Sequence, residues 1–183
     1  GTISSFLHNA HIFSSAVREI LEERYLRRAT DLDISLPHFN LLKLIDYNGD
    51  HQIKEIASFF GVSQAAASKT VEKMVRLGMV NREVQPEDRR AISLSLTNRA
   101  RHLIQKYETL KEESVREVLS QLDPDELSAL TRGLEKVGHL IFEKEPNVAD
   151  VCMKCSAYNV ERCPLQSLSD GCIYIQTRKQ AIH

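Results

Sequence analysis

The feature that most constrains the fold is a glycine flanked by two amphipathic segments. The first segment, residues 53–60, carries three apolar residues at helical spacing: Ile56, Ala57 and Phe60. Gly61 follows, and glycine readily adopts the left-handed backbone of a tight turn between helices. Ser63 can cap a second helix over 64–77. Its inward positions are Ala67, Val71, Met74 and Val75. A short helix, a glycine turn and a second helix predict a helix-turn-helix.

The residues after this pair predict a β-hairpin. Gly78 ends the second helix, and residues 79–84 and 91–96 alternate apolar and polar side chains, which is typical of strands. The segment between them, 85–90, is polar, charged and contains Pro86. We therefore expect a mainly α chain, a winged helix-turn-helix with a small antiparallel β-wing.

Long helices are expected on both sides of this unit. Residues 3–29 form one apolar stripe, made of Phe6, Ala10, Phe13, Val17, Ile20, Leu21 and Tyr25. Ser35 and Pro37 are typical of the start of a further helix, over 37–47. Thr97 can cap a helix that runs to about residue 122, and the sequence Asp-Pro-Asp-Glu at 123–126 predicts another helix start with a capping box. Such stripes cannot be buried by one helix alone.

Composition limits the classes of protein further. No segment reaches the roughly 18 consecutive apolar residues of a membrane span, and the N-terminal segment does not resemble a secretory signal, so we expect a cytoplasmic protein. The net charge is −1, yet residues 54–101 contain nine Lys or Arg against five Asp or Glu. A basic region in an otherwise acidic chain favours contact with a polyanion.

Over roughly residues 5–145 the chain resembles the MarR family of transcription regulators. The matching segments are LPHFNLL, IKEIASFFGVSQAAASKTVEKMVRLGMVNRE, the DRR of 88–90, and ISLSLTNRA. The resemblance implies a homodimer whose N- and C-terminal helices interlock, with two lobes that bind double-stranded DNA at a pseudo-palindromic operator. It divides the chain into an N-terminal dimerisation helix (1–34), a DNA-binding domain (35–97), C-terminal dimerisation helices (98–146) and a tail (147–183) outside the family pattern.

In a domain of this type the second helix enters the major groove with its N-terminal residues on the base edges. Those residues are Ser63, Gln64, Ala65, Ala67 and Ser68. Gln64 is suited to a bidentate contact with adenine, and the alanines allow close approach or meet thymine methyl groups. Three further cations, Lys69, Lys73 and Arg76, are expected on phosphates, although an ordinary solvated helix face would carry the same residues.

The expected wing contains Asp88, Arg89 and Arg90. A basic side chain there can enter the minor groove, and Asp88 can hold one arginine by a paired hydrogen bond. The alternative is a turn with a surface ion pair. The position between two expected strands favours DNA contact.

The tail contains all four cysteines of the chain: Cys152, Cys155, Cys163 and Cys172. Four thiolates favour a metal centre, and a single close pair followed by wider spacing, with a Cys-Pro at 163–164, favours a 4Fe-4S iron–sulfur cluster. Structural zinc is the alternative, although zinc ribbons usually have two close pairs. Disulfides are less expected in a reducing compartment.

We therefore expect a transcriptional repressor whose operator affinity depends on the state of a redox- or oxygen-sensing cluster. An alternative is a zinc-stapled regulator that responds to a small aromatic molecule or a metal in the dimer pocket. The histidines could contribute there, although ordinary surface histidines are the simpler interpretation: His8, His11, His38, His102 and His139. An enzyme is disfavoured, because the sequence has no nucleophile–base pair, paired acids or phosphate-binding glycine loop.

Overall fold

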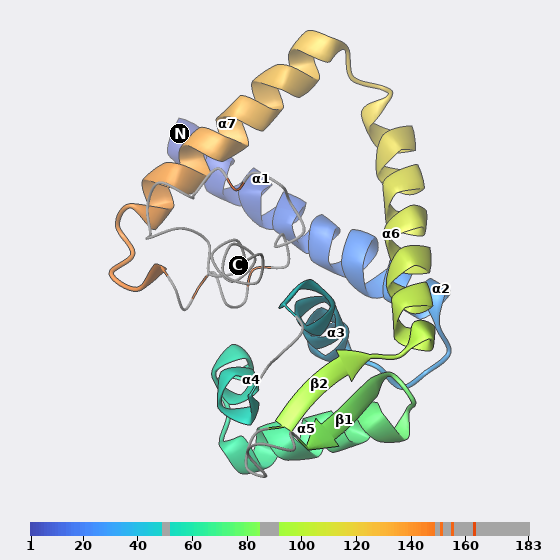
Figure 1. Cartoon of the computed structure of the whole chain (residues 1–183). Helices are drawn as coiled ribbons and strands as arrows, with labels where there is room; N and C mark the ends of the chain where they lie inside the picture. Colours follow the sequence, from blue (N-terminus) through green and yellow to red (C-terminus); the bar gives the residue numbers. More distant parts are fainter. Residues whose placement is uncertain (49–51, 85–91, 149–150, 152–154, 156–162, 164–183) are drawn as a thin grey trace, which may run out of the picture.

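The structure is a computed structural model, and it describes residues 1–48, 52–84, 92–148, 151, 155 and 163. Its helices and strands follow the expected order (Figure 1). They are α1 (Thr2–Ala16), the π-helical segment η1 (Val17–Arg24), α2 (Tyr25–Ala29), α3 (Leu36–Asn48), α4 (Ile53–Phe60), α5 (Gln64–Arg76), β1 (Val80–Val84), β2 (Ile92–Leu96), α6 (Asn98–Leu119) and α7 (Pro124–Phe142). The prediction of a mainly α fold with a small antiparallel sheet is confirmed.

One compact lobe is formed by α3, α4, α5 and the β1–β2 hairpin (Figure 1). The two strands are antiparallel, with Val80 opposite Leu96 and Arg82 opposite Leu94. The centre of the lobe is closed to solvent, because side chains from every element meet there. The most deeply buried of them are Phe39, Leu41, Leu42, Ile56, Val71, Met74, Met79 and Leu94.

One inward position expected from the sequence is wrong. Val75 is 37% exposed, because the buried face of α5 follows Ala67, Val71 and Met74, and one further residue rotates the side chain away from that face. On α4 the expected inward residue Phe60 is half-buried and packs against the core, and Phe59, which lies one turn after Ile56, is more deeply buried.

The remaining helices form an open frame above the lobe. In Figure 1, α6 rises from the end of β2, α7 turns back from its far end, and α1 runs beneath α7 toward the lobe. The expected single N-terminal helix is continuous but contains the π-helical η1. Neither α1, η1 nor α7 has a buried residue. Within the described residues, no helix is long and apolar enough to cross a membrane.

The frame meets the lobe through α2 and α6. Tyr25, Leu26 and Ala29 of α2 are buried in the same core as Leu103 and Tyr107 of α6. The Tyr25 hydroxyl also donates a hydrogen bond to Ser114 Oγ, further along α6. The helices that should form a dimer are therefore packed directly on the core of the lobe.

Candidate nucleic-acid interface

The two helices of the predicted helix-turn-helix are α4 and α5. Gly61 ends α4 with φ 63° and ψ 38°, a left-handed conformation that glycine adopts without a steric cost. Ser63 then begins α5 by accepting a hydrogen bond from the Ala66 backbone N–H to its Oγ at 3.3 Å. The start of α4 has its own capping box, in which Glu55 accepts a hydrogen bond from the Gln52 N–H at 2.9 Å. Both predicted boundaries are confirmed.

The solvent-facing side of α5 carries two cations. Exposed residues recur along it at alternating steps of four and three, which places them on one face of a helix: Ala65, Lys69, Glu72 and Arg76. We call these four residues the outer stripe. The stripe lies opposite the buried face of Ala67, Val71 and Met74, so it is the side that a groove of DNA can reach.

The structure separates the residues that the sequence assigned to base edges. Ser63, Gln64 and Ala65 are exposed at the N-terminal end of α5, and Ser68 is half-buried beside them. Ala67 is fully buried in the core, so its assignment to DNA is wrong. The spacing shared by Ala67 and Val71 already indicated a packing role.

Lys73 differs from Lys69 and Arg76. Its Nζ lies 2.8 Å from Oδ2 of Asp33, in the segment between α2 and α3. The hydrogen bond and charge of Lys73 hold the pKa of the Asp33 carboxyl below its usual value. Burial lowers the pKa of the neighbouring His38, and Lys73 lowers it further. In the free protein Lys73 therefore has an internal partner.

Hydrogen bonds from the start of α6 hold the C-terminal end of α5. The Thr97 hydroxyl donates to the carbonyl of Gly78 at 2.8 Å, and it accepts from the Ala100 N–H at 3.2 Å as the N-cap of α6. The Arg99 guanidinium donates to the carbonyl of Leu77 at 3.2 Å. A cation at the C-terminal end of a helix also complements its dipole. Helix α5 is thus joined directly to the base of α6.

Two charged residues near this surface were not singled out from the sequence. Glu72 lies in the outer stripe between the two cations, and Arg82 is exposed on β1, toward the wing. Helical spacing could have found Glu72. The three predicted wing residues, Asp88, Arg89 and Arg90, lie outside the described residues.

Two of the four predicted metal ligands, Cys152 and Cys172, also lie outside the described residues. Cys155 is exposed, whereas Cys163 is half-buried and packs against the hydrophobic core. Among the residues that the structure does describe, no group of three or more His, Cys, Asp or Glu could hold a metal ion. The five histidines therefore do not form such a group with other residues in the described part of the chain.

Comparisons with known proteins agree with this architecture. Residues 34–92 match the family model described as the MarR family. The uncharacterized HTH-type transcriptional regulator YfiV of Bacillus subtilis (strain 168) is 28% identical over an alignment of 136 residues, and the match covers 69% of this chain and 85% of YfiV.

Among solved structures, Streptococcus pneumoniae FabT in complex with DNA superposes with a TM-score of 0.60 at 20% identity, over 76% of this chain and 95% of FabT. Bacillus subtilis YusO gives a TM-score of 0.63 at 16% identity, over 75% of this chain and 94% of YusO. These two likenesses concern the fold.

The fold is that of a winged helix-turn-helix protein of the DNA-binding class, because α4 and α5 are followed by the β1–β2 hairpin and the outer stripe of α5 faces solvent. The family model covers this unit from the start of the lobe to the first residue of β2, and the similarity to YfiV covers about two thirds of the chain. The chain is a DNA-binding transcriptional regulator whose residues 34–92 match the MarR family.

Proposed function

We propose that the protein is a homodimeric repressor that binds a pseudo-palindromic operator through α5 and the wing. The observation that carries this proposal is the outer stripe, in which Lys69 and Arg76 face solvent opposite the buried face of α5. Gln64 at the N-terminal end is placed to contact base edges, and the two cations are placed for phosphates. Arg89 and Arg90 of the wing would extend the contact into the minor groove, with Asp88 orienting one of them.

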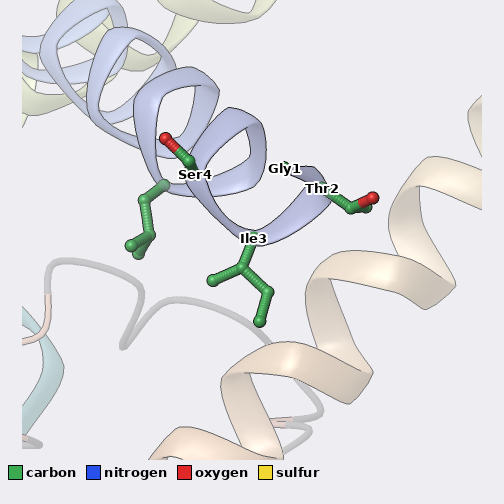
Figure 2. A pocket seen from close by; sticks show the side chains of 5 residues that line it. Gly1, Thr2, Ile3 and Ser4 are labelled. Atoms are coloured by element: carbon green, nitrogen blue, oxygen red, sulfur yellow. The ribbon is translucent and has the colours of Figure 1, made fainter.

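The apolar faces of α1 and α7 support the homodimer. On α1 the exposed apolar residues include Ile3 at 78%, Phe6 at 49% and Phe13 at 51%. An open hollow of about 650 Å³ lies beside the first turn, lined by Gly1, Thr2, Ile3, Ser4 and Leu7. Figure 2 shows Ile3 projecting from the first turn of α1 on the side where α7 lies. A second copy of these helices would cover the faces, in keeping with the division into dimerisation helices at 1–34 and 98–146.

The test of DNA binding compares three substitutions in α5 with one on the far helix. Lys69→Gln and Arg76→Gln should weaken binding to all sequences and each reduce the slope of log affinity against log salt by about one. Gln64→Ala should lower affinity for the operator by about 1–3 kcal/mol and relax its sequence preference. The matched control is Lys136→Gln, because Lys136 is exposed on the polar face of α7. Equal effects of Lys69→Gln and Lys136→Gln would contradict the proposal.

For the tail we propose a 4Fe-4S cluster held by Cys152, Cys155, Cys163 and Cys172, with structural zinc as the alternative. Four thiolates suit either centre. The packing of Cys163 against the hydrophobic core supports a connection between this centre and the DNA-binding lobe. A cluster would supply sensitivity to oxygen or redox state, and loss of the cluster would release the tail from the core and change operator affinity.

Anaerobic purification followed by an absorption spectrum and metal and sulfide analysis tests this proposal. We expect a brown protein with iron and sulfide, and a change in operator affinity after exposure to air. Cys163→Ser should remove the chromophore, and Ser156→Ala in the same tail should retain it. A colourless protein with one zinc per chain and oxygen-insensitive binding would overturn the cluster, and would favour a small aromatic effector bound between the dimer helices.

A further inference from the structure

Lys73 is the cation on α5 with an internal anionic partner. It lies one helical turn from both Lys69 and Arg76, on the flank of the outer stripe, so it reaches the same side of a bound duplex. Its Nζ is 2.8 Å from Oδ2 of Asp33, and the Asp33 side chain is 94% exposed. Among the described residues, Lys69 and Arg76 form no such ion pair.

The position of Asp33 is fixed by its neighbours along the chain. The Leu32 N–H donates to Oγ1 of Thr30 at 3.1 Å, and the Ile34 N–H donates to the carbonyl of Leu32 at 2.7 Å. Ile34 is buried in the core. The backbone on both sides of Asp33 is therefore anchored, and its carboxylate remains beside α5.

An ion pair this open to water contributes little to folding, because both charges are well solvated when separated. A structural role does not account for it well. Its location offers another explanation. The carboxylate has the charge of a phosphate and is held by a lysine beside the outer stripe, where the proposed mode of binding would bring the DNA backbone.

We propose that Asp33 acts as an internal phosphate mimic: it holds Lys73 in the free protein, and a DNA phosphate must displace it on binding. This inference rests on the proposed mode of DNA binding through α5. Asp33 then lowers affinity for all DNA alike, since phosphate contacts carry no sequence information. The loss should be greatest for weakly bound, non-operator DNA, which has no base contacts to help displace the carboxylate.

The test measures binding of the full-length protein to a random-sequence duplex of about 30 base pairs over a range of salt concentrations. Asp33→Asn should bind about two- to fivefold more tightly at low salt, and its log–log salt slope should steepen by about one. Asp31→Asn is the matched control, because Asp31 is exposed in the same segment and forms no ion pair with α5 among the described residues. The double variant Asp33→Asn with Lys73→Gln, compared with Lys73→Gln alone, should show no more gain than Asp31→Asn does.

Three outcomes would overturn the inference. Equal affinities for Asp33→Asn and Asp31→Asn would show that Asp33 does not compete for Lys73. Weaker binding by Asp33→Asn, with an unchanged melting temperature, would show that the pair positions α5. A gain that persists without Lys73 would mean that Asp33 only repels DNA. If the wild-type protein fails to bind any DNA, the proposed function falls as well, whereas the first three outcomes leave it standing.

Discussion

Lys43 of α3 is almost completely buried, and its Nζ lies 2.6 Å from Oε1 of Glu108 on α6. Among the described residues, no well-oriented hydrogen bond is donated to Glu108 Oε1. Its interaction with Lys43 is therefore that of an ion pair. A buried ammonium is costly unless an anion compensates it. Breaking this contact would leave a buried charge without compensation, so the pair joins α3 of the lobe firmly to α6.

We expect Glu108→Gln to lower the free energy of unfolding by about 1–2 kcal/mol, less than for a fully buried pair because 39% of the Glu108 side chain is exposed. Urea denaturation measures the change. Glu112→Gln, one turn further along α6, removes half of an exposed pair with Arg116 and should alter stability by less than about 0.5 kcal/mol. Similar losses for both variants would contradict a special role for the Lys43 pair.

Tyr107 predicts a loss of stability at alkaline pH. Burial, followed by the charges of Glu22, Glu108 and Glu23, raises the pKa of its hydroxyl above the ordinary value of 10.0. Above that pH the unfolded chain releases the proton while the folded chain keeps it, so the contribution is present below pH 10 and is lost as pH rises further.

Tyr107→Phe keeps the ring, which packs on Phe39 with centroids 4.5 Å apart, and removes the ionisable group. The wild-type protein should therefore lose more stability than Tyr107→Phe between about pH 10 and pH 11.5. Denaturation curves at several pH values measure this difference. Parallel decline of the two proteins would show that Tyr107 is not responsible.

The apolar stripe of α7 predicts how the dimer can be broken. Leu130, Leu134 and Ile141 are spaced on one face and are 44%, 50% and 62% exposed in one protomer. Leu134→Glu places a charge in that face and should give a monomer of 20.8 kDa by light scattering. Ser128→Glu, on the side of the same helix that faces away from this stripe, should leave the dimer intact. A dimer that survives Leu134→Glu would place the interface elsewhere.

The Thr97 hydroxyl joins the end of α5 to the start of α6, so we expect its removal to destabilise both. Thr97→Val preserves shape but removes both the N-cap of α6 and the hydrogen bond to the Gly78 carbonyl. The free energy of unfolding should fall by about 1–2 kcal/mol, and hydrogen exchange should quicken at the end of α5. Thr97→Ser retains the hydroxyl and should behave nearly as wild type. Slow exchange in Thr97→Val would locate the restraint in Arg99 instead.

Local patterns were sufficient for the elements of this fold. Gly61 and Ser63 act between neighbouring residues, so their turn and cap could be read from the sequence, as could the capping box at Asp123 and Glu126. Ala67 was misassigned to DNA because it stands near the N-terminal end of α5 as well as on its buried face, and only packing decides between the two positions.

Contacts between distant segments could not be predicted in the same way. The pairs Lys43 with Glu108 and Lys73 with Asp33 each join residues far apart in the chain, and nothing in the local spacing of charges identifies the partner. The π-helical turn of η1 also leaves the apolar pattern of the N-terminal helix almost unchanged, so periodicity predicted a single regular helix there.

The hydrogen bonds of Thr97 and Arg99 give α6 the properties of a lever arm. Its 22 residues span about 33 Å, and its base is fastened to the end of α5. A tilt of about 10° at the far end would therefore carry the base through about 6 Å, a sizeable part of the ~34 Å that separates successive major grooves. If two copies meet near the far ends of α6, a small change in their contact would be enough to move both α5 helices out of register with the major grooves.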